Sequence, residues 1–386
     1  MAIARIITHW SQDLILLTNF TFIVDFFGAK FALVNNFNVK KFTKMTKFLT
    51  QNFKYPKPVN FDEDDSGFDI FRNLPDEICP EAEIEMLKNV RVANNSMIFT
   101  YFKIWKETCI DFRKYNDKTY RFFLKFIFPQ FNFSKKKFVL ITDEWTCNYY
   151  HWHAFALKKL LILLEKKLID DQTIFLFPKS YKKYSFALES LKKFGLTKNK
   201  IVFLRRKSNI KVAELPLIKF PRQHPKIYQE IRKILIEKTP NFDSEFGERI
   251  YISREKRSFR IVENEAEVLT LLEKYGFKKI VAENFSYNEQ IAIFSKAKYL
   301  VGPHGAGLTN AMFLKEGGAL LEIATEQNSQ NFNKDFYALS TMVGINYLHQ
   351  KCEIDSKNSK IKDFYHGIIS VNLEKLEKNL KLMLGQ

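Results

Sequence analysis

From Phe138 onwards the chain alternates short apolar runs with segments of helical length, and no other feature constrains the fold as strongly. The apolar runs are FVLITD, TIFLF and IVFL, and amphipathic segments such as Tyr150–Lys166 and SFALESLKKFG lie between them. Short buried strands that alternate with helices are typical of βαβ units, whose strands form a parallel sheet. The sequence therefore predicts an α/β fold with Rossmann-like, doubly wound sheets.

The alternation is interrupted by a connector around Pro240–Gly247 and then restarts. RIYIS, KKIVA, YLVG and ALLEI are predicted strands, and LEKLEKNLKLML is a predicted closing helix. Ser286 and Glu289 have the spacing of a capping box before a helix, and Asn264 with Glu267 can cap the preceding one. Because 386 residues exceed the usual limit of a single core, we predict domains at 136–245 and 246–365, followed by a helix at 366–386.

Residues 1–135 show no comparable pattern. The apolar stretch DLILLTNFTFIVDFFGAKFALV is interrupted by Asp25 and Lys30, and Asp13 stands where a signal peptide has basic residues. An uninterrupted span of about 20 apolar residues is missing, so we expect buried core here, with peripheral membrane contact as the alternative. The segment Tyr55–Pro75 is rich in acids and turn formers and predicts a surface loop. Its Asp62-Glu63-Asp64 spells DxD, but we expect solvated acids rather than a metal site.

Composition limits the function in two ways. The net charge of +18 predicts attraction to anions, but the basic residues are spread along the chain without a nucleic-acid-binding motif. We therefore expect a solvated basic surface and no nucleic-acid partner. Cys79, Cys109, Cys147 and Cys352 lack metal-ligand or CxxC spacing, which predicts free thiols in a reducing compartment.

The stretch YLVGPHGAGLTNAMFL, from Tyr299 to Leu314, predicts a small anion cradle. A strand ends near Gly302, glycines at 305 and 307 surround His304, and a helix is predicted from about Gly307. Glycine permits positive φ and leaves the backbone N–H groups uncovered, and a helix N-terminus adds further donors. His304, with Thr309 and Asn310, can add side-chain hydrogen bonds. The alternative is a structural βα turn, since both the P-loop and G-x-G-x-x-G patterns are absent.

Residues near two other predicted strand ends favour the cradle. Arg254 follows the strand RIYIS, with Arg257 and Arg260 close behind it, and Asn264 and Glu265 lie at the next helix start. Arginine suits the bidentate binding of phosphate. Glu322 lies at the end of ALLE, where its carboxylate can accept hydrogen bonds from ribose hydroxyls. Taken together these residues predict a nucleoside diphosphate site, although each alone would fit an ordinary surface.

A second group is Asn148, His151, Trp152 and His153, where the strand FVLITD passes through a loop into a helix. His151 is suited to act as a general base toward a hydroxyl, and an exposed Trp152 could stack on a sugar ring. The alternative places Trp152 in the core and gives the histidines structural roles. A metal pair is not expected, because His151 and His153 share a face only on a strand.

In order and spacing, NYYHW at 148–152, YISR with RIVENE at 251–265, VGPHGAGLTN at 301–310 and LLEI at 320–323 resemble glycosyltransferase family 61. This family includes the EGF-domain O-GlcNAc transferase and plant xylan pentosyltransferases. The resemblance implies a GT-B fold, with two Rossmann-like domains facing a cleft. It places the acceptor in the domain at 136–245, to which 1–135 would contribute, and the donor in 246–365. It puts the donor site at Arg254, Arg260, Asn264, His304, Gly305, Ala306, Gly307, Thr309, Asn310 and Glu322.

The resemblance implies inverting transfer from a nucleotide sugar, with UDP as the expected nucleotide and with neither cofactor nor metal. The acceptor would be a hydroxyl of a cell-surface or capsular glycan, a lipid-linked sugar or a protein, in the cytoplasm or against a membrane. His151 or His153 would be the catalytic base, and Asn148 and Trp152 would lie on the acceptor side. Phe155 occupies a position where family members often carry an acid, so an orienting carboxylate is missing there. The alternatives are transfer of another group, such as pyruvyl, and a non-catalytic polyanion-binding protein.

Overall fold

The structure is a computed structural model that describes residues 51–72, 74, 77–79, 82–100, 104–108, 130–132, 136–206, 208–219, 224–258, 260–325, 334–354 and 368–386. The apolar stretch Asp13–Val34 and Cys109 lie outside these residues. Within them, Cys147 and Cys352 are free thiols, as predicted. Within these residues no helix is both long enough and apolar enough to span a membrane.

The C-terminal half contains a six-stranded sheet in the order β11-β10-β12-β13-β14-β15. All neighbours are parallel except β15, which pairs with β14 in the antiparallel direction. The strands are β10 (Arg249–Ile252), β11 (Lys278–Ile280), β12 (Tyr299–Pro303), β13 (Ala319–Thr325), β14 (Asn346–Ile354) and β15 (Ile369–Ser370). The four strands that the sequence predicts here are all present, and the parallel arrangement is confirmed.

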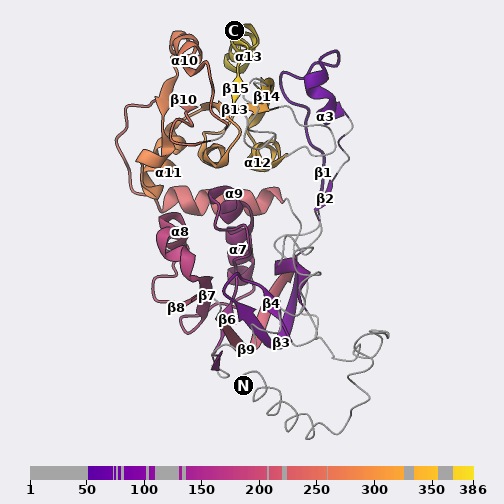
Figure 1. Ribbon diagram of the computed structural model, residues 1–386, viewed down its shortest axis with the longest axis vertical. Coiled ribbons are helices and arrows are strands. Elements are labelled where there is room, and N and C mark those ends of the chain that lie inside the picture. The colour runs from indigo at the N-terminus through magenta and orange to yellow at the C-terminus, as the bar shows by residue number, and fades with distance from the viewer. Residues whose placement is uncertain are drawn as a thin grey trace, which may run out of the picture. The chain divides into compact units, whose positions relative to one another are not determined.

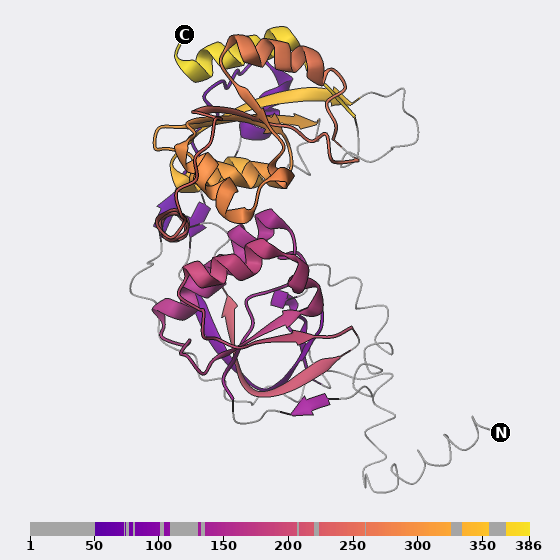
Figure 2. The ribbon, with the colours of Figure 1, turned by 90° about the vertical axis from the view of Figure 1, so that its left-hand side faces the viewer.

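Helices cover both faces of this sheet (Figures 1 and 2). One core cluster joins β12 Val301 to α10 (Glu265–Lys274) and α13 (Leu373–Leu384). The other joins β12 Leu300 to helices of the opposite face, which are α11 (Tyr287–Lys296), the 3₁₀ helix η8 (Ala306–Phe313) and α12 (Asp335–Val343). Neighbouring residues of a buried strand thus serve opposite faces, as expected of a doubly wound sheet.

The capping box predicted at Ser286 is confirmed, since Ser286 Oγ accepts from Glu289 N and Glu289 reaches back to Ser286 N. Two predicted details differ. The helix after the cradle is a 3₁₀ helix that begins at Ala306. Asn264 stands at the N-cap of α10 but makes no side-chain capping bond there.

The N-terminal half departs from the predicted single doubly wound sheet. β6 (Phe138–Val139), β7 (Ile174–Pro178) and β8 (Ile201–Leu204) form a three-stranded parallel sheet, as expected. The chain then enters β9 (Asn209–Lys219), which pairs antiparallel with β3 (Glu83–Ala93). β4 (Ile98–Phe99) and β5 (Gln130–Asn132) complete a separate four-stranded sheet. β9 was not predicted, because its pairing partner lies in the region without a recognisable pattern.

The helix predicted at 150–166 is present but not uniform. It consists of α6 (Tyr149–His151), a π-helical turn (Trp152–Ala156) and α7 (Leu157–Glu165). The helices α8 (Ser185–Lys193) and α9 (Pro225–Glu237) follow, with the short 3₁₀ helix η6 (Lys179–Lys183) before α8. Single π turns inside helices occur frequently at functional sites, because they change the direction of the side chains that follow.

Residues 55–72 contact the C-terminal half, so their predicted place in the acceptor domain is wrong. Asn60 Nδ2 donates to His349 O at 2.8 Å, and His349 N donates to Asn60 Oδ1 at 3.0 Å. Asp65 forms an ion pair with Lys375 of α13. The segment also includes the 3₁₀ helix η2 (Ser66–Phe68) and α3 (Asp69–Arg72), so it is only partly the loop that the sequence predicts.

The DxD motif lies in this segment and takes part in local contacts. Asp62 Oδ1 accepts a hydrogen bond from Asp64 N at 3.0 Å, and Glu63 forms an exposed ion pair with Lys57 at 3.2 Å. Both contacts are those of a solvated turn. Among the residues that the structure describes, no group of three or more His, Cys, Asp or Glu residues is placed to hold a metal ion.

Candidate active site

Arg254 and the Gly-rich cradle meet at one edge of the C-terminal sheet. β10 and β12 are parallel neighbours, with Tyr251 opposite Val301. Arg254 and Gly305 therefore each follow the carboxyl end of their strand by two residues. A Cβ atom added to Gly305 would lie 1.8 Å from Arg254 Nη1. The guanidinium group thus rests directly on the backbone of Gly305, and the predicted proximity of the two motifs is confirmed.

The cradle glycines are needed for close approach rather than for positive φ. None of Gly302, Gly305 and Gly307 has a φ in the left-handed region, so that part of the expectation is wrong. A Cβ on Gly302 would lie 3.1 Å from Ile252 O, and one on Gly307 would lie 3.2 Å from Ile252 Cγ2. The end of β10 therefore packs so closely on the cradle that a side chain would have to displace it.

Gly305→Ala is expected to weaken nucleotide binding about tenfold or more without destabilising the fold. The new methyl group displaces only the flexible end of Arg254, whereas the methyl group in Gly302→Ala would press on the backbone of Ile252. Titration calorimetry with UDP and thermal melts of both variants would separate the two effects. Wild-type UDP affinity in Gly305→Ala would contradict a role for the Arg254–Gly305 contact.

The arginine-rich turn after β10 concentrates positive charge. Burial lowers the pKa of Arg254, and the nearby positive charges of Arg260 and Arg257 lower it as well. Together these effects bring the pKa to about 10. Arg257 forms an ion pair with Glu283 at 2.6 Å, and Arg260 has a left-handed backbone with φ of 55°. A phosphate bound at this turn would relieve the repulsion among the guanidinium groups.

His304 is held by a buried carboxylate. Glu322 Oε1 accepts from His304 Nδ1, and Glu322 Oε2 accepts from Tyr347 Oη at 2.7 Å. Burial alone would raise the pKa of Glu322, but the charge and hydrogen bonds of His304 and the bond from Tyr347 leave that pKa below its ordinary value. That Glu322 binds a ribose hydroxyl stays a prediction, because each carboxylate oxygen can accept a further hydrogen bond. Glu322 also fixes the His304 ring through its bond with Nδ1.

Two predicted donor-site amides serve the fold. Asn310 is fully buried, accepts from Tyr149 Oη at 3.0 Å and donates to Gln290 Oε1 at 3.1 Å. Asn264 donates to Val371 O at 2.9 Å and accepts from Val371 N at 3.0 Å. Both side-chain amides therefore hold structural hydrogen bonds.

Three other predicted residues have different surroundings. Ala306 is half-buried at the start of η8, where the first N–H groups have no acceptor within the helix. Thr309 is fully buried, and its hydroxyl has no hydrogen-bond partner in the described part of the chain. Asn148 is exposed, and its side chain caps α6 by accepting from Tyr150 N at 2.8 Å.

His151 lies half-buried among aromatic rings. Its ring centroid is 5.1 Å from that of Trp145 and 5.4 Å from that of Phe155, which stacks on it. Burial lowers the pKa of His151, and the charges of Asp335 and Asp143 oppose that shift. Phe155 thus fills the space at the usual acidic position, and the carboxylates that act on His151 come from elsewhere in the chain. A histidine that stays neutral at pH 7 can accept a proton.

His153 and Trp152 are core residues, which agrees with the structural alternative that the sequence left open for this group. His153 is fully buried, with Nδ1 at 2.7 Å from Tyr149 O and Nε2 at 2.9 Å from Tyr287 Oη, and burial lowers its pKa to about 4. Trp152 is also fully buried, and its Nε1 donates to Ser190 Oγ at 2.9 Å. The π-helical turn that begins at Trp152 directs both side chains inward.

Trp145 is the exposed tryptophan that the sequence did not single out. Half of its surface is exposed (50%), and it lies beside His151. Its loop is fixed by Asp143 Oδ1, which accepts from Trp145 N at 3.0 Å and from Thr146 N at 3.1 Å. One sequence signal could have indicated its exposure. Trp145 follows Asp143 by two residues at the end of a predicted strand, where turns are common.

The two predicted groups are linked through α12. The ring of Phe336 lies 5.2 Å from the ring of His304 and 5.2 Å from that of Tyr150. Tyr150 in turn lies 5.2 Å from His151. The rings of Phe336 and Tyr150 therefore lie between His151 and His304 of the cradle. The hydrogen bond from Tyr149 to Asn310 also joins the two groups. The His151 group and the cradle are thus connected through the buried side chains of Tyr150 and Phe336.

Comparison with known proteins agrees with the predicted resemblance. The sequence model of glycosyltransferase family 61 matches residues 9–321, which is most of the chain. The protein belongs to this family.

A curated relative is similar over a shorter stretch. The EGF domain-specific O-linked N-acetylglucosamine transferase of Drosophila melanogaster is 34% identical over 100 residues, which are 25% of this chain and 18% of that protein. The match therefore spans about a fifth of the relative's length.

Proposed function

We propose that the protein is an inverting glycosyltransferase of GT-B architecture that moves a sugar from a nucleotide donor to a hydroxyl acceptor. The observation that carries the proposal is the contact of Arg254 with Gly305, together with the aromatic path that leads from the cradle to His151. Membership of a glycosyltransferase family supports the reaction class. The Drosophila melanogaster relative is by name an N-acetylglucosamine transferase, which supports an amino sugar as the transferred group.

The diphosphate of the donor would bind at the carboxyl edge of β10 and β12. Arg254 offers a planar pair of donors, and the amides at the start of η8 offer unpaired N–H groups. His304, held by Glu322, presents its second nitrogen and becomes a donor at both nitrogens when it is protonated. Positive charge from these groups would do what a divalent metal does in other glycosyltransferases, so we propose a metal-independent reaction.

The chemical step would be a single displacement at the anomeric carbon. The acceptor oxygen attacks from the face opposite the diphosphate, its proton passes to a ring nitrogen of His151, and the bond from the anomeric carbon to the diphosphate oxygen breaks. The configuration at that carbon is thereby inverted. Charge accumulates on the leaving diphosphate, so donors placed in advance at the cradle stabilise the transition state more than the ground state.

Two alternative functions predict different experimental results. Transfer of another group, such as pyruvyl, would use the same fold without releasing a nucleoside diphosphate. A non-catalytic polyanion-binding protein would bind any polyanion with a steep salt dependence. The cluster of Arg254, Arg257 and Arg260 at one strand end favours a defined phosphate ligand over diffuse attraction.

The test is a screen of UDP-, GDP-, CMP- and dTDP-sugars in which release of the free nucleotide is measured with and without a chelator. We expect slow donor hydrolysis for one nucleotide class, since water can replace a missing acceptor, and no loss of rate with chelator. Absence of both nucleotide release and saturable nucleotide binding across the panel would contradict the proposal.

A further inference from the structure

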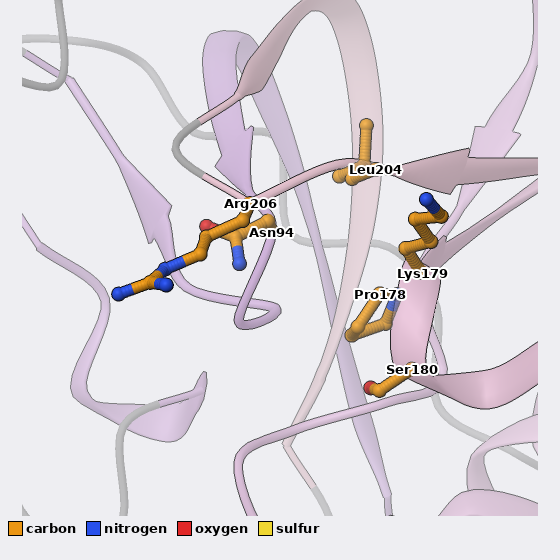
Figure 3. Close-up of a pocket in the computed structure, with 6 residues that line it drawn as sticks. All are labelled: Asn94, Pro178, Lys179, Ser180, Leu204 and Arg206. Atoms are coloured by element: carbon orange, nitrogen blue, oxygen red, sulfur yellow. The ribbon is translucent and has the colours of Figure 1, made fainter.

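A second concave region lies at the carboxyl edge of the N-terminal parallel sheet (Figure 3). It is a pocket of about 380 Å³, lined by Asn94, Pro178, Lys179, Ser180, Leu204 and Arg206. Pro178 ends β7 and Leu204 ends β8, so the pocket occupies the edge at which parallel sheets bind ligands. Figure 3 shows Lys179 on one side of the pocket and Asn94 and Arg206 across from it, with the guanidinium group of Arg206 reaching outward.

The two loops that border the pocket are basic. Residues 178–184, which include η6, carry three lysines, residues 205 and 206 are both arginines, and neither segment contains an acid. Lys179 and Arg206 are both exposed. Over the whole chain there are 43 acidic residues against 61 basic ones, so two acid-free loops at one strand edge concentrate charge beyond the average. Such a pocket attracts an anionic group.

The pocket is next to the loop that carries Trp145. Tyr181, which follows Ser180, has its hydroxyl 2.7 Å from Thr146 Oγ1. On the other side of the pocket Asn95, which follows Asn94, donates to Glu144 Oε1 at 3.4 Å. Both walls of the pocket thus touch the loop between β6 and α6. Asp143 of this loop is ion-paired with Lys159 at 3.1 Å, which offsets its negative charge.

We propose that this edge is the acceptor site and that it selects an acceptor sugar bearing an anionic group, either a carboxylate or a phosphate. The anion would bind at Lys179 and Arg206, and a sugar ring would pack on the exposed face of Trp145, next to His151. An aromatic platform with neighbouring cations suits an acidic sugar because its ring carries apolar C–H faces and its substituent carries charge. This inference rests on the proposed function, since it assigns the acceptor of that reaction.

Ligand-observed NMR tests the inference with three probes, which are methyl glucuronide, glucose 6-phosphate and neutral methyl glucoside. We expect both anionic probes, or one of them, to bind about tenfold more tightly than the neutral one at low salt. The comparison of the carboxylate with the phosphate distinguishes the two sources of charge. The double variant Lys179→Ala/Arg206→Ala should abolish the preference, and Trp145→Ala should weaken all probes that bind.

The matched control is Lys198→Ala/Lys200→Ala, which removes the same charge from exposed positions before β8, at the opposite edge of the sheet. This control should keep the preference. Equal or undetectable binding of all three probes overturns the inference, as does a preference that survives loss of Lys179 and Arg206 or is lost equally in the control. UDP titration of the same samples reports on the donor site, so failure at the acceptor edge is distinguishable from failure of the proposed function.

Discussion

Arg254→Ala is expected to lower the rate of nucleotide release about 10²–10³-fold and to weaken UDP binding strongly, while the protein stays folded. Arg254 is half-buried and touches the cradle at Gly305. Loss of its guanidinium group removes both charge and paired donors from the position where the diphosphate would leave. Steady-state kinetics and titration calorimetry measure the two effects.

Arg254→Lys should recover only part of the activity, because an ammonium group keeps the charge but cannot bind phosphate in a bidentate manner. Lys256→Ala is the matched control, since Lys256 is an exposed cation two positions further along the same turn. If Lys256→Ala impaired UDP binding as much as Arg254→Ala, general electrostatic attraction would explain the result and the site would be misplaced.

His151→Ala should lower turnover about 10²–10⁴-fold with little change in UDP affinity, because the residue is proposed to act on the acceptor rather than on the donor. Burial lowers the pKa of His151 from its ordinary value of 6.5, so the base is neutral and active at pH 7. Activity should therefore be retained as the pH falls to 6.5 and be lost only below it. The pH profile of kcat/KM measures this acidic limb, which is the fall in activity as His151 becomes protonated.

Asp335→Asn should move the same limb to still lower pH. The negative charge of Asp335 raises the pKa of His151 against the effect of burial, so its removal lowers that pKa further. The sign of the shift separates an electrostatic role of Asp335 from simple loss of structure, which would lower activity at every pH. An acidic limb that stays in place in Asp335→Asn would argue against His151 as the titrating base.

The C-terminal half could be predicted from sequence because its signals are local. Four of its six strands are apolar runs bounded by turn residues, and the capping box at Ser286 marks the start of α11, whereas β14 and β15 were not predicted. The N-terminal half depends on pairing between distant segments, since β3 and β9 are more than a hundred residues apart. Strand pairing of that kind leaves little trace in local periodicity.

In the candidate site, the sequence placed residues at strand ends correctly but could not assign their hydrogen bonds. The proximity of Arg254 and Gly305 follows from two parallel strands that end at one edge. Occupation of Glu322 by His304 and Tyr347 depends instead on side chains from neighbouring strands. The sequence left open whether Trp152 lies at the surface or in the core; the structure places it in the core, at the start of a π-helical turn that has no periodic signal in the sequence.

The central claim is that the diphosphate of a nucleotide sugar binds between Arg254 and the start of η8, with His151 on the acceptor side of the sugar. A crystal structure of the protein with UDP tests it most directly. We predict that phosphate oxygens lie within hydrogen-bonding distance of the Arg254 guanidinium group and of the backbone N–H groups at Gly305–Gly307. A nucleotide bound with its phosphates away from Arg254 and the cradle would contradict the account.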